Sequence, residues 1–430
     1  MHWTHVVARP NVVRVSSTTD TTTWEGHPRG SREYKRLVAA LLFAGIATFA
    51  QLYSVQGILP LIASNLQITP SQSSLTVGLA TVGVAVAVLP WSVVADRIGR
   101  VKAMTISIVT ATVLGLIVPL SSSLPMLLSV RFLEGLALGG LPAIAIAYLS
   151  EEVHPRFTAL AAATYVSGTT LGGLLGRVVA GPVAEFTDWR IGTMTVSLVA
   201  AVAAVLFLVL APKPRRFRGH VEDGPSVTTR LWANLKDPGM LALYAQGFLL
   251  MGGFVAVYNF LGFRLNGEPF GLPQSAISLI FVAYLSGTVS SRVAGQLAVK
   301  FDRGPVLAGS TAVMIAGVAL TISDNLVVIL TGLVVFTVGF FAAHAIASGW
   351  TGQRAVVGRA QATSLYNLFY YGGSSVVGWG GGVIFQQFGW TAMAVTVMGL
   401  ALLAAAVMRF AHQPSVRQPS ADQPMAPQPT

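Results

Sequence analysis

Long apolar segments constrain this chain more than any other feature of its sequence. About twelve of them lie between Leu37 and Phe410, and each is long enough to cross a bilayer. A hydrocarbon core of about 30 Å needs roughly 20 consecutive apolar residues in a helix. Charged residues make up only 10% of the chain, whereas an ordinary soluble domain contains about 25%. The sequence therefore predicts an all-α integral membrane protein.

The distribution of Lys and Arg predicts how the segments are oriented. We place the twelve spans at 37–59, 72–94, 101–120, 125–148, 158–184, 191–211, 239–263, 275–297, 305–322, 326–347, 361–385 and 391–410. Basic residues gather in every second connection, as in 96–102 and 211–236, and such residues favour cytoplasmic loops. We therefore expect a multi-pass protein of the inner (plasma) membrane with both termini in the cytoplasm.

The two halves of the chain repeat each other weakly. Tyr165 and Trp189 are 24 residues apart, and so are Tyr366 and Trp390. A second match at nearly the same offset follows spans two and eight, and repetition of this kind indicates duplication. The expected domains are a disordered cytoplasmic tail (1–36), an N-terminal six-helix bundle (37–211), a cytoplasmic linker (212–238), a C-terminal six-helix bundle (239–411) and a second disordered cytoplasmic tail (412–430).

Several classes of function lack the residues that they need. The chain has no Cys, and its seven His show no metal-ligand spacing, so we expect no metal and no cofactor. It contains no Walker-type Gly-x-x-x-x-Gly-Lys loop and no His-Glu-x-x-His motif, which argues against an ATP-driven pump and a metalloenzyme. The net charge of +11 is dispersed over short loops, so it indicates membrane topology and contacts with anionic lipid rather than nucleic acid.

Three motifs resemble those of a known family. Residues 92–100, Ser-Val-Val-Ala-Asp-Arg-Ile-Gly-Arg, are similar to the pattern Gly-x-x-x-Asp-Arg-x-Gly-Arg of the major facilitator superfamily, with Ser92 in place of the first Gly. Residues 131–135 resemble the Arg-x-x-Gln-Gly pattern of proton-coupled members, with Glu134 in place of Gln, and 168–182 resemble the Gly-rich motif of drug antiporters. The chain thus resembles the family over nearly its whole length, and in particular its bacterial arabinose-efflux-like branch. The resemblance implies two pseudo-symmetric six-helix bundles with a substrate site between them.

A charged cluster lies at the predicted cytoplasmic surface. The resemblance implies that this motif latches the two halves together when the cytoplasmic side is closed. Glu151 and Glu152 end the fourth span at the same depth, where they can pair with an Arg of the motif. The alternative is a set of loop charges that only orient the chain. The latch candidates are Asp96, Arg97, Gly99, Arg100, Glu151 and Glu152.

Arg131 and Glu134 are the most informative pair of charged residues within the spans, because residues three apart share a helical face and their side chains can meet. A charge inside a bilayer costs roughly 3 kcal/mol or more and normally faces a polar interior. We expect Glu134 to carry a proton, with Arg131 keeping it ionised until substrate binding or a conformational change separates the two. The alternatives are a structural ion pair, or a misplaced span that leaves both residues near the surface. Arg177 is expected to face Glu134 or an anionic substrate; the alternative is that it bonds backbone carbonyls of its Gly-rich helix. His344 is the second candidate proton carrier.

Polar and aromatic residues within the spans are candidates to line a substrate cavity, although each can equally form a hydrogen bond between helices. They are Gln51, Tyr53, Gln56, Gln246, Tyr258, Asn259, Tyr284, Tyr366, Asn367 and Tyr370. Small residues of spans five and eleven let helices approach closely, either near the seam between the halves or as ordinary packing. They are Gly168, Gly172, Gly173, Gly176, Gly181, Pro182, Gly373 and Gly382. We expect 380–382, three consecutive glycines, to mark a bend.

The sequence and the resemblance together predict a secondary active transporter, which is not an enzyme. We expect a monomer that moves a small organic solute by alternating access, with efflux by proton antiport as the expected mode. Its partners would be a small-molecule substrate, protons and the lipid bilayer. The alternative is uptake of cyanate, a sugar or an organic acid, either uncoupled or by proton symport. An alternative of another class is a non-transporting membrane sensor, which would need a signalling domain that neither tail is long enough to form.

Overall fold

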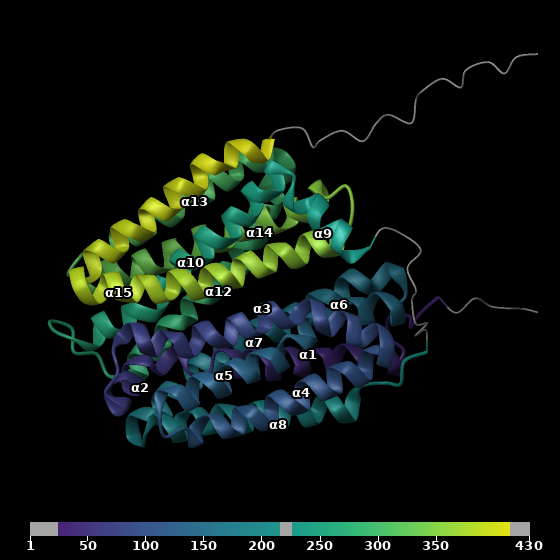
Figure 1. Ribbon diagram of the computed structural model, residues 1–430, viewed down its shortest axis with the longest axis horizontal. Coiled ribbons are helices and arrows are strands. Elements are labelled where there is room, and N and C mark those ends of the chain that lie inside the picture. Colours follow the sequence, from purple (N-terminus) through teal and green to yellow (C-terminus); the bar gives the residue numbers. More distant parts are fainter. Residues whose placement is uncertain (1–24, 216–225, 413–430) are drawn as a thin grey trace, which may run out of the picture.

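The structure is a computed structural model that describes residues 25–215 and 226–412. Within these ranges the regular secondary structure is helical, apart from one isolated bridge between His27 and Val153. Figure 1 shows two layers, with the N-terminal helices (purple to blue) in one bundle and the C-terminal helices (green to yellow) in the other. The expected fold class, a pair of six-helix bundles, is confirmed.

The N-terminal bundle contains six spans, two of which are interrupted. In chain order they are α1 (Arg32–Leu52) with η1 (Gln56–Ile58) and α2 (Leu59–Leu66), α3 (Pro70–Ile98), α4 (Arg100–Ile117) with η2 (Val118–Leu120), α5 (Leu124–Leu138) with α6 (Gly140–Glu152), α7 (Pro155–Phe186) and α8 (Trp189–Leu210). Local signals start these helices. Thr69 and Gln72 form a reciprocal capping box at the start of α3, and Asp188 caps α8.

The C-terminal bundle follows a short connecting helix, α9 (Val227–Leu235). Its helices are α10 (Pro238–Asn266), α11 (Gln274–Leu279) with η3 (Ile280–Ala283) and α12 (Tyr284–Lys300), α13 (Arg303–Leu320), α14 (Leu326–Arg354), and α15 (Arg359–Val407) with η4 (Met408–His412). Two predicted spans lie in α15, which turns at Gly389, where φ is +77°. The bend expected at 380–382 is therefore wrong: the backbone is helical there, and Gly389 makes the turn because only glycine adopts such a φ without strain.

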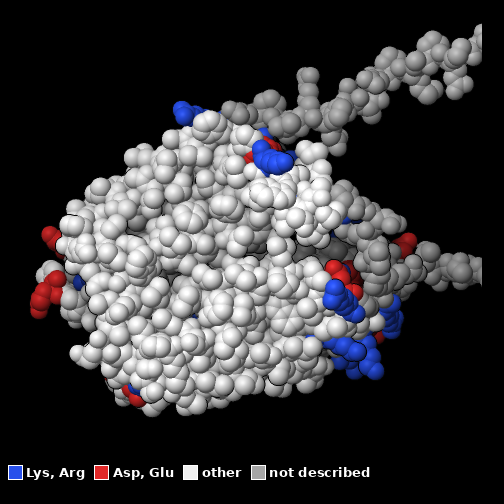
Figure 2. Space-filling model, viewed as in Figure 1, with Lys and Arg blue, Asp and Glu red and all other residues white. Residues whose placement is uncertain are grey.

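The helices suit a membrane in length and composition. Among the described residues, ten helical segments meet these criteria. α15 is one of the ten although it carries two predicted spans, and α7, which is rich in Gly and Thr, supplies the twelfth. Figure 2 shows a broad uncharged surface, with Lys and Arg concentrated at one end of the molecule. We call this end, which carries the connections α3–α4, α8–α9 and α14–α15, the basic end.

The first span is broken rather than continuous, contrary to the expected span 37–59. α1 ends at Leu52, residues 53–55 form a turn, and η1 and α2 carry the chain on to Leu66. Pro60 lies at the start of α2, a position where proline is favoured because no helical N–H is lost. We call residues 53–58 the α1 break. It places backbone groups and side chains of the first span deep inside the bundle.

Corresponding positions of the two bundles share unusual features, as a duplication predicts. Gly99, between α3 and α4, and Asp302, between α12 and α13, both have positive φ, +97° and +65°. Trp189 and Trp390 start equivalent segments, and each donates its indole N–H at 2.9 Å, to the end of α2 and to the end of α13. The weak sequence repeat therefore coincides with a positive φ at both turns, although the two indoles bond to spans one and nine, which do not correspond to each other.

The bundles contact each other away from the basic end. Ser375 of α15 shares a hydrogen bond with Thr81 of α3 at 2.9 Å and donates to the carbonyl of Gly78 at 2.8 Å. The Ser275 N–H at the start of α11 donates to Glu185 near the end of α7 at 2.7 Å. Toward the basic end the surface is indented between the two bundles (Figure 2). We call the contact between α3 and α15 the seam.

The expected tails and linker lie mostly outside the described residues. Of the expected tail 1–36, residues 1–24 are not described, but 32–36 already belong to α1, and His27 bonds to the backbone of 152–154. The first bundle therefore begins earlier than expected, because this segment finds backbone partners. Within the expected linker 212–238, α9 is helical, and 216–225 are not described. The expected tail 412–430 lies outside the description from residue 413 onward.

Candidate functional site

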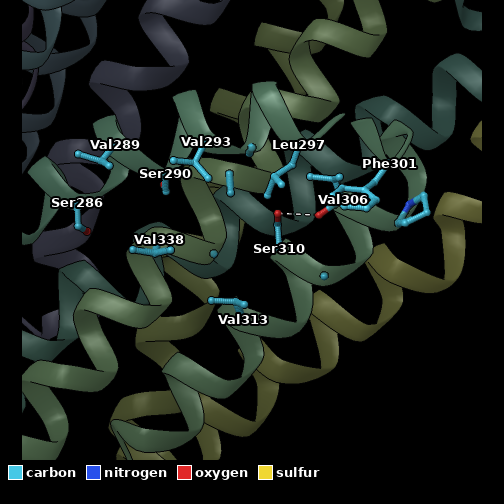
Figure 3. Close-up of a pocket in the computed structure, with 15 residues that line it drawn as sticks. Ser286, Val289, Ser290, Val293, Leu297, Phe301, Val306, Ser310, Val313 and Val338 are labelled. Carbon is cyan, nitrogen blue, oxygen red and sulfur yellow. Dashed lines mark hydrogen bonds between the residues drawn. The ribbon is translucent and has the colours of Figure 1, made fainter. Parts of the chain in front are cut away.

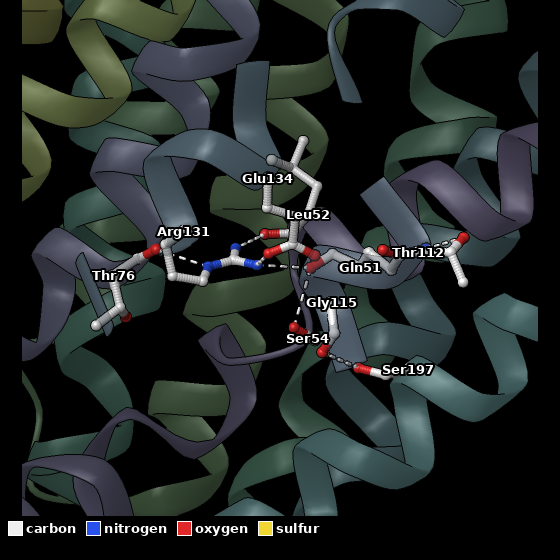
Figure 4. A network of polar contacts seen from close by, with 9 residues as sticks. All are labelled: Gln51, Leu52, Ser54, Thr76, Thr112, Gly115, Arg131, Glu134 and Ser197. Carbon is white, nitrogen blue, oxygen red and sulfur yellow. Dashed lines mark hydrogen bonds and ion pairs between the residues drawn. The ribbon is translucent and has the colours of Figure 1, made fainter. Parts of the chain in front are cut away.

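Arg131 and Glu134 of α5 form a buried ion pair inside the N-terminal bundle (Figure 4). Arg131 Nη1 lies 2.5 Å from Glu134 Oε2, and the two side chains are 0% and 1% exposed. Their i, i+3 spacing places both on one face of α5. Two charges that lose their hydration need further hydrogen bonds besides the one between them, so the surroundings of the pair decide whether it is stable.

The other donors of Arg131 bind backbone carbonyls where α1 ends. Arg131 Nη2 donates to Leu52 O at 2.5 Å, and Nη1 donates to Gln51 O at 3.1 Å. Its Nε donates to Thr76 O of α3 at 3.0 Å. The last carbonyls of a helix lack partners within that helix, and α1 ends at Leu52. Arg131 therefore stabilises the α1 break as well as balancing Glu134.

Glu134 Oε1, the carboxylate oxygen that does not contact Arg131, lies near Gly115 of α4, where there is no side chain. A Cβ added to Gly115 would lie 2.6 Å from Gln51 Oε1 and 3.1 Å from Glu134 Oε1. Gln51 Oε1 is buried without a hydrogen-bond partner among the described residues, while Nε2 of the same side chain contacts Thr112 at 3.4 Å. Two acceptor oxygens thus lie beside Gly115, and the described residues supply no donor to Gln51 Oε1.

Arg177 of α7 is a second buried guanidinium, 3% exposed. Nε donates to Gln56 Oε1 at 2.7 Å, and Nη1 donates to Gly173 O at 2.6 Å. Arg177 Cζ lies 3.7 Å from the ring centre of Tyr53 and 4.5 Å from that of Tyr284. No carboxylate of the described chain lies within ion-pair distance of it. The cation is therefore held by neutral groups, and its expected contact with an acid does not form.

The surroundings of Arg177 come from both bundles. Gln56 Nε2 donates to Asn259 Oδ1 of α10 at 2.8 Å. Arg177, Gln56 and Asn259 therefore form one polar chain from α7 through η1 to α10. Tyr53 follows α1 in the first bundle, whereas Tyr284 begins α12 in the second. We call Arg177 with Tyr53, Gln56, Asn259 and Tyr284 the arginine site.

Gly57 lets the chain pass close to Arg177. A Cβ at Gly57 would collide with the backbone carbonyl of Arg177, so a larger residue would push η1 and α7 apart. The carbonyl of Gly57 accepts hydrogen bonds from Gln274 Nε2 at 2.5 Å and from Ser278 Oγ at 3.3 Å. These donors lie on α11, so the arginine site adjoins a direct contact between the bundles.

His344 lies in a separate group within the C-terminal bundle. Its Nδ1 is 3.0 Å from Tyr366 Oη, and its ring centre is 4.7 Å from that of Tyr370. Within the described residues, the hydrogen bond and ring contacts of His344 go to aromatic residues of its own bundle, not to Glu134. The structure therefore does not bring the two candidate proton carriers together.

An aromatic cluster extends from the arginine site into the C-terminal bundle. The ring of Phe254 lies 4.8 Å from Tyr258, 5.4 Å from Tyr284 and 3.9 Å from Phe340. Tyr258 is also hydrogen-bonded to Thr337 at 2.6 Å. These rings give the arginine site an apolar wall on the side of the second bundle.

Two candidate cavity residues lie apart from the arginine site. Gln246 Nε2 donates to Ala404 O at 2.6 Å and so ties α10 to the second half of α15. Asn367 is half-buried and forms no hydrogen bond with the part of the chain that the structure describes. Gln246 therefore fits the alternative reading, a hydrogen bond between helices.

Three of the predicted latch residues meet at the basic end. Arg100 Nη1 lies 2.5 Å from Asp96 Oδ1, and Arg100 Nη2 lies 2.9 Å from Glu151 Oε1. All three belong to the N-terminal bundle. The group therefore joins α3, α4 and α6, and the ion pairs of Arg100 do not reach across to the second bundle.

The remaining latch candidates have other roles in the structure. Gly99 supplies the positive φ of the turn between α3 and α4. Arg97 is exposed. Glu152 accepts a hydrogen bond from the Arg215 backbone N–H at 2.8 Å, and the ion pair with the motif is made by Glu151 instead.

Most of the predicted packing glycines hold helices together within a bundle. A Cβ at Gly168, Gly172 or Gly176 would collide with the α1 backbone at Leu42, Ile46 or Ala50, and one at Gly373 would collide with the α10 backbone. Gly173 leaves room for Arg177, because a Cβ there would lie 3.1 Å from Nη1. The glycines at every fourth position of α7 thus let its backbone contact that of α1.

Gly181 and Gly382 lie where the bundles meet. A Cβ on Gly181 would collide with Ser278, and one on Gly382 would lie 2.8 Å from the Cα of Ser71. Pro182 follows inside α7, near its end. Of the predicted packing residues, Gly181 and Gly382 near the ends of spans five and eleven thus meet the other bundle, whereas those in the middles of these spans pack within their own bundle.

A groove of about 920 Å³ lies on the outer face of α12, α13 and α14 (Figure 3). Its walls are apolar and include exposed Val289, Val293 and Leu297. The hydroxyls of its serines donate to carbonyls of their own helices, at 2.7 Å for Ser310 and 3.1 Å for Ser290. The polar side chains among its lining residues are three serines whose hydroxyl hydrogens are already bonded, so the groove suits lipid chains better than a polar substrate.

Sequence reasoning missed residues whose partners are distant in the chain. Thr81 and Ser375 are 294 positions apart, so no local spacing relates them. Phe254 and Phe281 are common apolar residues, and nothing distinguishes them from ordinary core residues before the fold is known. The α1 break had one available signal, Pro60, which permits a helix to start where a continuous span was expected.

The chain is similar to known membrane transporters. A family model described as Major Facilitator Superfamily matches residues 41–376. The inner membrane transport protein YnfM of Escherichia coli (strain K12) is 37% identical over 369 residues, 86% of this chain and 88% of that protein. The uncharacterized MFS-type transporter YybF of Bacillus subtilis (strain 168) is 35% identical over 362 residues, 84% of this chain and 90% of that protein.

A solved structure with low sequence identity has the same fold. It is that of a bacterial homolog to the human lysosomal transporter Spinster, in an inward-facing and occupied conformation. The TM-score is 0.74 at 15% identity, over 89% of this chain and 97% of that chain.

Proposed function

Because the chain belongs to the Major Facilitator Superfamily of membrane transporters, we propose that it exports a small organic solute in exchange for protons. The observation that carries the proposal is the buried Arg131–Glu134 pair at the α1 break. An ionisable pair inside a membrane protein is costly to bury and usually has a function. A carboxylate beside a guanidinium can take up or release a proton when their contact changes.

Protonation of Glu134 would act on the arginine site through the α1 break. The neutral acid would no longer balance Arg131, and beside Gly115 it would offer a proton donor near Gln51 Oε1, which has no hydrogen-bond partner in the described part of the chain. Arg131 binds the last carbonyls of α1, and the residues that follow them form part of the arginine site. A proton on Glu134 and a solute at Arg177 would therefore influence each other through one short stretch of chain.

Alternating access would come from movement of the bundles about this centre. The basic end is proposed to be cytoplasmic, because Lys and Arg favour that side. Contacts such as Ser375–Thr81, near the middle of the bundles, and Ser275–Glu185, at the other end, lie away from the basic end, so this conformation would admit solute from the cytoplasm. In the opposite conformation, Asp96 and its partners at the basic end would form the proposed latch between the bundles. A single chain contains both bundles, so we propose that it works as a monomer.

Uptake by proton symport is the second candidate. The Arg131–Glu134 pair and the polar chain from Arg177 to Asn259 serve this mode as well, because coupling depends on linked occupancy and not on direction. Antiport moves protons against the solute, whereas symport moves them with it. The sign of the proton flux therefore separates the two.

The test uses the purified full chain in liposomes that contain a trapped pH dye. A panel of sugars, organic acids, amino acids and hydrophobic drugs is added to wild type and to Glu134→Gln. We expect at least one solute to trigger a proton flux, and we expect Glu134→Gln to abolish it while solute exchange without a pH gradient continues. The charge-neutralising control is Glu268→Gln, at an exposed position outside the spans.

The outcomes separate the possible couplings. Full proton flux in Glu134→Gln would move proton transfer to another group, and His344→Gln would be measured next. Solute exchange without any proton flux in wild type would replace the coupled mechanism with an uncoupled facilitator. A flux in the same direction as the solute would favour uptake by symport.

A further inference from the structure

We propose that the arginine site binds the transported solute and that this solute is a small organic anion, a carboxylate with an apolar body. The inference rests on the proposed transport function and adds the class of substrate. Its elements are the buried Arg177 cation, the rings that face it and the polar chain that joins it to the other bundle.

No carboxylate among the described residues balances the charge of Arg177. It is 3% exposed, and its hydrogen-bond acceptors are an amide oxygen and a backbone carbonyl. Of the three guanidinium groups discussed above, Arg131 and Arg100 each have a carboxylate partner, whereas Arg177 has none among the described residues. Burying a cation without a counter-charge costs several kcal/mol, on the order of the values known for buried ions. An anionic solute would supply the missing charge.

The rings around Arg177 compensate only part of that cost. Cation–π contacts contribute about 0.5–2 kcal/mol each, and Tyr53 and Tyr284 approach the guanidinium from the two bundles. Phe281 adds a third ring at 5.4 Å. The same rings provide a flat apolar wall, so they favour a solute whose body is apolar. A strongly hydrated polyanion would gain little from this wall.

Through this polar chain, an anion bound at Arg177 would affect the contact between the two bundles. Gln56 binds Arg177 through its oxygen and Asn259 through its nitrogen. A carboxylate that reached Arg177 would compete with Gln56 Oε1 for the guanidinium, because a charged acceptor forms the stronger hydrogen bond. Release of Gln56 would then loosen its contact with the second bundle. Binding would thus favour movement of the bundles, which transport requires.

The first test measures binding with matched pairs of compounds. Benzoate, phenylacetate and sorbate are each compared with their primary amides on the purified full chain, through the ligand-induced shift in thermal unfolding. We expect a carboxylate to bind wild type at least tenfold more tightly than its amide. Arg177→Gln should lose this preference, Arg177→Lys should keep part of it because the charge remains, and Arg156→Gln, which removes an exposed arginine, should behave as wild type.

A second variant tests the missing counter-charge without removing Arg177. Gln56→Glu keeps the size of the side chain and places a carboxylate where Gln56 Oε1 now lies 2.7 Å from Arg177 Nε. We expect it to fold and to weaken carboxylate binding at least tenfold, because the internal acid occupies the cation. Unchanged carboxylate binding in Gln56→Glu and in Arg177→Gln would overturn the proposal, and so would a panel in which no carboxylate binds better than its amide.

The same liposomes distinguish failure of this inference from failure of the proposed function. Proton flux driven by a neutral or cationic solute, lost in Glu134→Gln and kept in Arg177→Gln, would retain proton coupling and remove the anion site. Carboxylate binding that depends on Arg177, without any proton flux, would retain the anion site and remove proton coupling.

Discussion

At the scale of single residues, the two bundles form the corresponding turn with different amino acids. Gly99 has φ +97° and ψ 148°, and Asp302, at the equivalent position of the second bundle, has φ +65° and ψ 163°. This region of backbone conformation is essentially restricted to glycine. Asp302 makes no side-chain capping hydrogen bond that would offset the strain. The first copy of the motif therefore has the residue that the turn favours, and the second does not.

Exchanging glycine and non-glycine at these positions should have opposite effects. We expect Gly99→Ala to lower the free energy of unfolding by about 1–3 kcal/mol, the usual cost of such a conformation, and Asp302→Gly to raise it by a similar or smaller amount. Thermal unfolding of the purified variants measures both. Gly295→Ala is the control, because a Cβ there meets nothing within 4 Å and its φ is ordinary. Equal stability of Gly99→Ala and Gly295→Ala would contradict the assigned strain.

Local spacing decided how well residues of the site could be predicted. Arg131 and Glu134 lie on one turn of one helix, so the sequence indicated their contact, which the structure contains. The neighbours of Arg177 come from η1, α10 and α12, and no spacing relates them before the bundles are assembled. The sequence could therefore predict a buried charge at Arg177, but not the rings and amides that surround it.

At the scale of elements, the contact between α1 and α7 depends on glycines at every fourth residue. Gly168, Gly172 and Gly176 place the α7 backbone against the carbonyls of α1. Close backbone packing of this kind is the main means of association for helices in a bilayer, where apolar side chains gain little by leaving lipid. Because α1 carries the break and α7 carries Arg177, this contact also sets the geometry of the arginine site.

A single methyl group should therefore disturb this contact. In Gly172→Ala the new Cβ would lie 2.5 Å from Ile46 O and 2.7 Å from Ile46 Cα, so one backbone must move. We expect the free energy of unfolding to fall by about 1–3 kcal/mol, as for other overpacked positions. Gly380→Ala, on α15 with nothing within 4 Å of the added Cβ, should be neutral or slightly stabilising. Similar melting temperatures for the two variants would contradict a tight α1–α7 contact.

The elements themselves were predicted well where hydropathy alone decides them. The spans follow the apolar segments, and capping residues such as Thr69 and Asp188 lie where helices begin. Hydropathy does not define the α1 break, because residues 53–55 are Tyr, Ser and Val, and polar residues of this kind also lie inside continuous helices, as Tyr258 and Asn259 do in α10. Nor could it choose between 380–382 and Gly389 for the bend in α15, since both are glycines and only packing around them separates them.

At the scale of the whole molecule, the sequence indicated two bundles but not their relative position. Duplication and charge distribution predict the pair, whereas the conformation depends on contacts such as that of Ser375 with Thr81 and Gly78, which are weak and distant in the chain. A transporter needs such contacts to be breakable. The seam is therefore expected to be formed in one conformation and separated in the other.

The seam can be locked because the chain has no cysteine of its own. A Cβ on Gly78 would lie 3.7 Å from the Cβ of Ser375, within the range of about 3.5–4.5 Å found across disulfides. We expect the double variant Gly78→Cys with Ser375→Cys to form a disulfide on mild oxidation and to lose at least 90% of its transport, which a reductant restores. Each single variant should be insensitive to oxidation, because it lacks a partner thiol. Transport that continues at the reduced rate in fully cross-linked protein would mean that α3 and α15 do not separate during the cycle, and movement of the bundles at the seam would have to be abandoned.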